Sequence, residues 1–195
     1  MGARSVDVFI LAGGKSERMG VDKATMIVGG RPLICRVVEA AKHLGSIHIV
    51  GGAPGLVDLV HSHCRDVPTP VHIADSSTDP GPFGAVVGAL GQLSAPLGLF
   101  LSCDLAALTT ADVDWLIASQ RSSGADYVVP LVGGERQWHG LCLSSEIIPR
   151  LTATHDRGVR SMRQGFAGFS ECTVLSSNPT FFIDVDSPED LRSLS

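Results

Sequence analysis

Short runs of β-branched and other apolar residues alternate with longer helical patterns along this chain, and this alternation constrains the fold more than any other feature. The helical pattern is clearest over 32–44, where Leu33, Val37 and Ala41 share one face. Strands that alternate with helices predict an α/β fold in which a mostly parallel sheet carries helices on both faces.

The predicted elements extend over nearly the whole chain. Strands are expected at 6–11, 47–50, 71–74, 97–103, 126–131, 137–143, 172–175 and 181–185. Helices are expected at 32–44, 55–64, 83–93, 111–119, 147–151, 158–166 and 187–194. Thr109 and Asp112 form an approximate capping box at the start of one helix, and Ser187 and Pro188 mark the start of the last.

Composition narrows the class of protein. Hydrophobic residues make up 44% of the 195 residues and no repeat or charge block divides them, so we expect a single domain over 1–195. A net charge of −5 argues against non-specific nucleic-acid binding, which needs a basic face. No apolar run approaches the ~20 residues that span a bilayer, and the start lacks a signal-peptide pattern. Five cysteines without a C-x-x-C pair are typical of buried thiols, so we expect a cytoplasmic protein with no membrane contact.

Ligands of open α/β sheets bind outside the carboxyl ends of strands, and the loop after the first predicted strand has the composition of an anion site. Gly13 and Gly14 allow a sharp turn, which would bring backbone N–H groups against a ligand. Arg18 and Lys23 add cationic groups, and two of the chain's three lysines lie in this loop. A glycine-rich turn with solvated charges is the alternative.

The loop from Leu11 to Lys23 reads L-A-G-G-x-S-x-R-M-G-x-D-K and resembles the signature of nucleotidyltransferases that activate phosphorylated compounds with a nucleoside triphosphate. Within them the chain is most similar to the molybdenum cofactor guanylyltransferase family, which joins GMP to molybdopterin. Further matching segments follow in the family's order at 81–84, 102–104, 137–141, 157–161 and 182–191. The resemblance therefore covers essentially the whole chain.

This resemblance implies a three-layer, mostly parallel Rossmann-like sheet of the nucleotide-diphospho-sugar transferase type. It also implies the site residues. The catalytic residues would be Arg18, Lys23 and Asp104, and nucleotide contacts would come from Leu11, Ala12, Gly13, Gly14, Lys23, Asp75, Gly81, Gly84 and Asp104. The implied partners are GTP, molybdopterin or molybdenum cofactor, and a molybdoenzyme or delivery chaperone that receives the product.

Two carboxylates are candidate ligands of Mg²⁺, which protein sites hold through one or two carboxylates beside substrate phosphates. Asp104 follows an apolar strand, and Asp186 follows another just before a helix start. The two could share one ion if those strands are neighbours. Asp104 could instead cap its own turn, Asp186 could be stabilised by the helix dipole, and Asp184 alternates with Asp186 as a second ligand.

The motifs leave more than one nucleotide and more than one acceptor open. In the family, Leu-Ala-Gly-Gly accompanies guanine, which favours GTP, whereas the acidic Asp184 and Asp186 are more typical of cytidylyltransferase relatives; guanylyltransferases often carry asparagine there. A cytidylyltransferase acting on molybdopterin or another phosphorylated acceptor is therefore one alternative. A catalytically weak nucleotide-binding adaptor in cofactor delivery is another, because Leu105 and Ala106 replace the usual Met-Pro after Asp104 and predict a looser turn.

Several residues are candidates for acceptor binding. Arg157, Arg160 and Arg163 recur every three residues, and they either face the phosphate of the pterin or form a solvated face. Trp138 and His139 either line an acceptor pocket or belong to the core.

Overall fold

The structure is a computed structural model that describes residues 6–13, 22–74 and 81–175. Its main sheet has the strand order β10-β7-β9-β6-β1-β4-β5, and β8 pairs with β7. The strands are β1 (Val6–Leu11), β4 (Gly45–Val50), β5 (Val71–Ile73), β6 (Leu97–Ser102), β7 (Tyr127–Val132), β8 (Glu135–Arg136), β9 (Gly140–Ser144) and β10 (Glu171–Leu175). Among the described strands of this sheet, only β8 and β9 run against the direction of the others, so the predicted mostly parallel sheet is confirmed.

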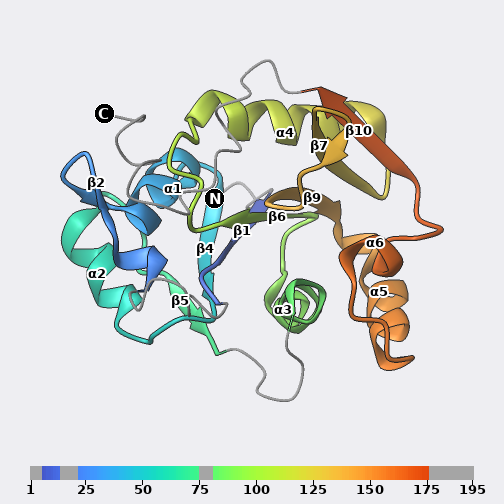
Figure 1. The fold of residues 1–195 in the computed structure, drawn as a ribbon, viewed down its shortest axis with the longest axis horizontal. Helices are drawn as coiled ribbons and strands as arrows, with labels where there is room; N and C mark the ends of the chain where they lie inside the picture. The colour runs from blue at the N-terminus through green and yellow to red at the C-terminus, as the bar shows by residue number, and fades with distance from the viewer. Residues whose placement is uncertain (1–5, 14–21, 75–80, 176–195) are drawn as a thin grey trace.

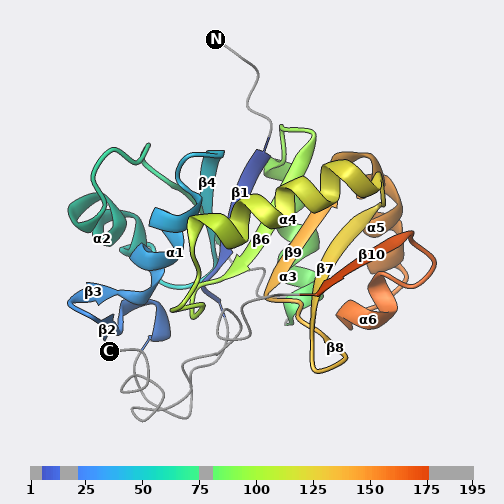
Figure 2. The same cartoon turned by 90° about the horizontal axis from the view of Figure 1, so that it is seen from above.

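Helices cover both faces of this sheet (Figures 1 and 2). The helices α1 (Leu33–Ala41), α2 (Leu56–His63) and α4 (Thr110–Ser123) pack with Val8 and Ile10 in one core. The helices α3 (Pro82–Ala89), α5 (Ile148–Asp156) and α6 (Met162–Gly165) pack with Phe9 and Phe100 in the other. Alternate side chains of β1 thus enter opposite cores, as the pleat of a strand requires, and the three predicted layers are present.

The short elements complete the described chain. A hairpin of β2 (Ile27–Val28) and β3 (Arg31–Pro32) precedes α1, and sequence patterns did not predict it. Both residues of its turn, Gly29 and Gly30, have a positive φ. Single 3₁₀ turns are η1 (Lys23–Thr25), η2 (Leu90–Gln92) and η3 (Ser145–Ile147).

Most predicted elements are confirmed, including the capping box at α4, where Thr109 accepts from the N–H of Asp112 and the Asp112 carboxylate accepts in return. The helix predicted at 158–166 is wrong in extent, because α6 contains only four residues and Gly158 turns the chain with φ +90°. The strand predicted at 137–143 starts later, at Gly140. The strand at 181–185 and the helix at 187–194 lie outside the described residues.

The edge where parallel strands end determines the location of the site. Leu11 of β1 is the register partner of Ser102 of β6, so both strands end at the same level. The antiparallel β9 begins there, with Gly140 opposite Leu101. This edge therefore brings together the segments 11–13, 102–104 and 137–139.

All five cysteines are free thiols, and four of them are buried, as their spacing predicts. Within the described ranges, we find no helix with the length and apolar character that crossing a bilayer requires.

Candidate active site

Two predicted catalytic residues, Lys23 and Asp104, meet at the carboxyl edge of the sheet. The Nζ atom of Lys23 lies 3.5 Å from Oδ2 of Asp104, and their side chains are 22% and 13% exposed. The hydroxyl of Ser102, the last residue of β6, donates to Oδ1 of the same carboxylate. A lysine ammonium and a positioned carboxylate thus converge from separate segments, an arrangement suited to binding phosphates together with a cation.

Asp22 fixes the turn that carries Lys23 through both its side chain and its backbone. The Asp22 carboxylate accepts from the N–H of Ala24 at 3.0 Å, and the hydroxyl of Thr25 donates to the Asp22 carbonyl at 2.8 Å. These bonds cap η1, the turn on which Lys23 lies. Asp22 therefore caps the turn of this site. The sequence signature contains Asp22 but does not indicate this role.

The segment after β1 is fixed by both neighbouring strands. The N–H groups of Ala12 and Gly13 both donate to the carbonyl of Val50, at 2.8 and 3.1 Å. The carbonyl of Leu11 accepts from the N–H of Cys103 at 3.1 Å. The expectation that N–H groups at this turn face a ligand is therefore wrong for Ala12 and Gly13, because both already donate within the sheet edge.

The turn after Asp104 is well anchored, so the looser turn predicted for Leu105 and Ala106 is wrong. Both side chains are buried, and the N–H of Ala106 donates to the carbonyl of Asp104 at 2.8 Å. The guanidinium of Arg36 donates to the carbonyl of Ala106, also at 2.8 Å. These contacts replace the rigidity that a proline would give.

Arg36 is a positioning residue that our sequence reasoning missed. Besides Ala106, it donates to the carbonyl of Val28 at 3.3 Å, and so joins α1 to both the hairpin and the Asp104 turn. The signal was present in the sequence, since Arg36 interrupts the apolar run from Leu33 to Val38. A charged residue within a buried helical face needs polar partners.

Cys103 lies next to Asp104 but does not provide a nucleophile. Burial raises the pKa of the Cys103 thiol to about 12, and the nearby Asp104 carboxylate acts in the same direction. The thiol is therefore protonated at neutral pH, whereas the thiolate is the nucleophilic form. The groups of this site that can act on phosphates are therefore the charged side chains of Lys23 and Asp104.

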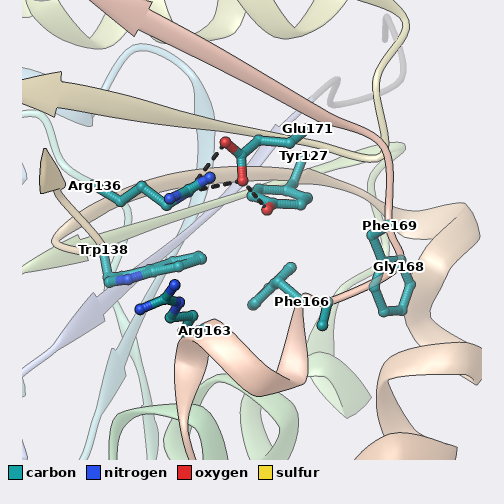
Figure 3. A pocket seen from close by; sticks show the side chains of 9 residues that line it. Tyr127, Arg136, Trp138, Arg163, Phe166, Gly168, Phe169 and Glu171 are labelled. Atoms are coloured by element: carbon teal, nitrogen blue, oxygen red, sulfur yellow. Dashed lines mark hydrogen bonds and ion pairs between the residues drawn. The ribbon is translucent and has the colours of Figure 1, made fainter. Parts of the chain in front are cut away.

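On the other side of Asp104, the start of β9 leads to a pocket. The carbonyl of His139 accepts from the N–H of Ser102 at 3.1 Å, and the preceding Trp138 lines a pocket of about 250 Å³. Figure 3 shows this aromatic pocket. Its lining residues are Tyr127, Arg136, Trp138, Arg163, Phe166, Ala167, Gly168, Phe169 and Glu171. Trp138 thus lines a pocket and also packs against the core around Phe166.

The three arginines spaced along 157–163 do not act as one face. Arg163 lines the aromatic pocket. Arg157 donates to the hydroxyl of Thr154 at 3.0 Å, and Arg160 donates to the carbonyls of His155 and Val159. The periodicity of three would align them on a continuous helix, but most of this segment is not helical.

The glycines at the start of α3 lie against the segment that carries the pocket. Gly81 has φ +130°, and a Cβ at this position would lie 3.9 Å from the carbonyl of Arg160. Gly84 is buried in α3. Phe83 between them packs edge-on against Phe166 of the pocket at 6.0 Å. The predicted nucleotide contacts Gly81 and Gly84 therefore border the α5–α6 region.

The remaining predicted site residues, Gly14, Arg18, Asp75, Asp184 and Asp186, lie outside the described residues. Among the residues that are described, no three His, Cys, Asp or Glu side chains form a group that could hold a metal. Within the described ranges, Asp104 supplies one hard carboxylate at the end of β6. This fits Mg²⁺, which is commonly held by one or two carboxylates together with substrate phosphates.

Known proteins match this chain over nearly its whole length. A molybdenum cofactor guanylyltransferase from Shewanella woodyi is 28% identical over 193 residues, which cover 97% of this chain and 95% of that protein. A probable molybdenum cofactor guanylyltransferase from Trichormus variabilis is 27% identical, over 96% of this chain and 89% of its own.

Solved structures share the three-layer architecture. Molybdopterin-guanine dinucleotide biosynthesis protein A from Archaeoglobus fulgidus superposes with a TM-score of 0.76 at 16% identity, covering 96% of both chains. The 2-C-methyl-D-erythritol 4-phosphate cytidylyltransferase from Thermus thermophilus gives 0.70 at 18% identity, covering 97% of both. The family model of the MobA-like NTP transferase domain matches residues 8–171, and this chain therefore belongs to that family.

Proposed function

We propose that this protein is a guanylyltransferase that transfers GMP from GTP to the phosphate of molybdopterin and releases pyrophosphate, forming molybdopterin guanine dinucleotide. The observation that carries the proposal is the convergence of Lys23 and Asp104 at the carboxyl edge of β1 and β6. Membership in an NTP transferase family supports the reaction class, and the names of the relatives support the guanylyl group and the acceptor. We place the reaction in the cytoplasm, where reduced cysteines persist.

The reaction requires anions to be brought together. An oxygen of the acceptor's phosphate attacks the α-phosphorus of GTP, the bond to the β-phosphate oxygen breaks, and pyrophosphate leaves with the electron pair. Because the reactants repel each other, positioning and charge stabilisation supply most of the catalysis. Lys23 contributes a point charge at the triphosphate, with Arg18 as a second cationic group.

Asp104 is the residue that would hold Mg²⁺, with Asp186 as the second carboxylate. The Asp104 carboxylate is already oriented by the hydroxyl of Ser102. When bound, the ion would neutralise charge on the phosphates. Gly14, Asp75, Gly81 and Gly84 complete the proposed nucleotide contacts.

The hydrogen bonding of the Leu11–Gly13 segment supports guanine. The N–H groups of Ala12 and Gly13 donate to Val50, and the carbonyl of Leu11 accepts from Cys103, so this segment would read a base through the carbonyl oxygens of Ala12 and Gly13. Guanine offers a ring N–H and an amino group as neighbouring donors, whereas cytosine offers only its amino donor on this edge. Two carbonyl acceptors therefore match guanine better.

Calorimetric titration with GTP and CTP, each with and without Mg²⁺, tests the nucleotide. We expect GTP to bind more tightly and Mg²⁺ to strengthen its binding. Incubation with GTP and molybdopterin, followed by mass spectrometry, tests the transfer. Equal or tighter binding of CTP would exclude the guanylyl assignment, and absence of the dinucleotide product would exclude the acceptor.

A further inference from the structure

Two cysteines from different elements lie against each other where α1 and α2 pack side by side (Figure 2). Cys35 is in the first turn of α1, and Cys64 directly follows α2. The thiol of Cys64 donates to the carbonyl of Cys35 at 3.8 Å, and a hydrogen bond also joins the two thiol side chains. Two sulfur atoms in hydrogen-bond contact need a movement of only about 2 Å to reach the S–S distance of about 2.05 Å.

The segment that carries Cys64 is held along α1. The N–H of Cys64 donates to the carbonyl of Val60 at 2.8 Å, and this bond ends α2. The ammonium of Lys42, which follows the last residue of α1, donates to the carbonyl of Arg65 at 3.4 Å. The chain after α2 therefore contacts both the start of α1, at Cys35, and its end.

The surroundings of the pair make Cys64 the reactive partner. Its hydrogen bond with the Cys35 thiol lowers the pKa of Cys64, and the charges of Arg31 and Lys42 act in the same direction, whereas burial and Glu39 oppose them. The same hydrogen bond raises the pKa of Cys35. When Cys64 loses its proton, Cys35 thus keeps its own and donates to the thiolate. The thiolate is the form of cysteine that attacks an oxidant.

Cys64 also retains contact with solvent at the end of α2. It is 5% exposed and lies between the exposed residues His63 and Arg65. An oxidant little larger than water can therefore reach this sulfur. Cys103 and Cys142 have different surroundings, because burial raises the pKa of each thiol to about 12 and keeps it protonated.

We propose that Cys35 and Cys64 form an oxidation site, at which a hydroperoxide converts the two thiols to an intramolecular disulfide. The Cys64 thiolate attacks one oxygen of hydrogen peroxide, the O–O bond breaks, and the leaving hydroxide takes a proton from solvent, which gives a sulfenic acid and water. The Cys35 sulfur then attacks the sulfur of Cys64, the S–O bond breaks, and hydroxide leaves as water with the Cys35 proton. Two thiols are oxidised and one peroxide is reduced to two waters, and a dithiol reductant reverses the reaction.

The disulfide acts on the Asp104 turn through the next residue of α1. Arg36 follows Cys35 and donates to the carbonyl of Ala106 at 2.8 Å. Forming the S–S bond draws the start of α1 toward Cys64. A shift of about 1 Å takes the Arg36 bond beyond the range of about 2.7–3.2 Å for N–H···O hydrogen bonds. Oxidation therefore loosens the turn that carries Asp104.

Peptide mapping of the full chain after treatment with hydrogen peroxide tests the site. Trypsin releases the peptides 24–36 and 43–65, and each contains one of the two cysteines. Without reductant we expect one linked peptide, with the mass of both minus two hydrogens. Dithiothreitol should restore two separate peptides. Thiol titration in denaturant should show the loss of two of the five thiols.

Serine variants separate the roles of the two cysteines. Cys35→Ser and Cys64→Ser should each abolish the linked peptide. Cys35→Ser should leave a sulfenic acid on Cys64 that dimedone traps, whereas Cys64→Ser should give at least about tenfold less trapping on Cys35, because the buried thiol stays protonated. Cys172→Ser is the matched control: Cys172 is less buried than Cys64 and lies on β10, at the opposite edge of the sheet from β5, so this variant should still form the linked peptide.

Hydrogen exchange tests the connection to the Asp104 turn. The N–H groups of Ala106 and Leu108 donate to the carbonyls of Asp104 and Leu105. In the oxidised wild type we expect these two amides to exchange about fivefold faster or more, on the scale of one lost hydrogen bond. Cys64→Ser after the same treatment should exchange like the reduced wild type. Turnover of the oxidised wild type should fall by a similar factor and recover with dithiothreitol.

The outcomes are separate from those of the proposed function, because neither the peptide map nor hydrogen exchange needs a nucleotide. Absence of the linked peptide in the folded wild type, or a disulfide from Cys64 to a cysteine other than Cys35, overturns the oxidation site. A linked peptide with unchanged exchange overturns the effect on the Asp104 turn. If the disulfide forms and exchange accelerates but the reduced protein transfers no GMP, this inference stands and the proposed function falls. Where a serine variant fails to fold, the map of the wild type decides.

Discussion

The Nε atom of Arg36 donates to the carbonyl of Ala106 at 2.8 Å, and this bond anchors the turn that carries Asp104 to α1. The same guanidinium reaches the carbonyl of Val28 in the β2–β3 hairpin. The hairpin and the Asp104 turn therefore share one anchor, although they are far apart in the sequence.

Replacing this anchor should affect both stability and turnover. Arg36→Met keeps much of the side-chain volume but leaves two carbonyls without their donor. We expect the free energy of unfolding to fall by about 1.5–3 kcal/mol, the range for hydrogen bonds to charged groups, and kcat to fall more than the KM for GTP rises. Urea unfolding and steady-state kinetics measure these changes.

The conservative variant makes the test of Arg36 sharper. Arg36→Lys should recover part of the stability but not kcat, because a lysine cannot fork to two carbonyls. The exposed Arg65→Met is the control and should change neither quantity. Unchanged turnover in Arg36→Met would show that the Asp104 turn needs no anchor from α1.

Lys23 should matter for turnover and little for stability. Lys23→Ala removes the ammonium that lies 3.5 Å from Asp104, so the triphosphate loses a point charge. We expect turnover to fall about tenfold or more, and Arg18→Ala to behave in the same way. Lys42→Ala is the matched control, because Lys42 follows α1 and pairs with Glu39 at 2.8 Å rather than with Asp104. Full activity of Lys23→Ala would place the triphosphate elsewhere.

The parallel part of this fold follows from local sequence. The strand at β9 was also predicted, but its antiparallel direction was not. The run Val6–Leu11 and its counterparts are apolar enough for a sheet buried on both faces. The chain between Val132 and Gly140 is too short for the crossover that parallel strands require, so β7 and β9 must be antiparallel. The direction of β9 therefore follows from the length of the connection and not from the residues of the strand itself.

The Lys23–Asp104 pairing was predictable because each residue belongs to a motif next to a strand end. The aromatic pocket was not, because Tyr127, Trp138, Phe166 and Glu171 come from separate elements that only the tertiary fold assembles. Arg163 was one of three equivalent arginines in the sequence. Only the break at Gly158 and the short α6 separate it from Arg157 and Arg160.

Asp104→Asn tests the proposed metal ligand. The amide keeps the shape of the side chain and its contact with Ser102 but removes the charge that would balance Mg²⁺. We expect weaker Mg²⁺-dependent binding of GTP and a loss of turnover of about 10²-fold or more, on the scale of one removed electrostatic contact in the transition state. Asp186→Asn should have a smaller effect, since guanylyltransferases of the family often carry asparagine there. Retention of full Mg²⁺-dependent affinity in Asp104→Asn would exclude this residue as the ligand.

His48 should make the fold sensitive to acid. Its ring is 6% exposed and stacked on Phe9 at 4.7 Å, and neither ring nitrogen has a hydrogen-bond partner among the described residues. Burial lowers the pKa of His48, although the nearby Asp7 carboxylate opposes the shift. The folded state therefore favours the neutral ring, so stability is complete above the unfolded pKa of about 6.5 and is lost as the pH falls below it.

Unfolding by urea between pH 8 and pH 5 measures this effect. His48→Phe should keep the stacking and flatten the pH dependence below pH 6.5. The control His61→Gln changes an exposed histidine of α2 and should leave the profile unchanged. Identical profiles for His48→Phe and the wild type would mean that other groups cause the acid sensitivity.

Gly165 should tolerate no side chain, because α6 packs against α3 at this point. A Cβ at Gly165 would lie 2.2 Å from the ring of Phe83, which is fully buried and cannot move without disturbing Phe166. Gly165→Ala should therefore lower the free energy of unfolding by about 1–3 kcal/mol, the cost of overpacking a core. Gly88→Ala in α3 is the control: a Cβ there meets no atom within 4 Å, so the same substitution should stabilise the helix by about 0.5–1 kcal/mol. Thermal and urea unfolding of the two variants compare them directly, and equal stability would mean that α3 and α6 separate easily enough to admit the methyl group.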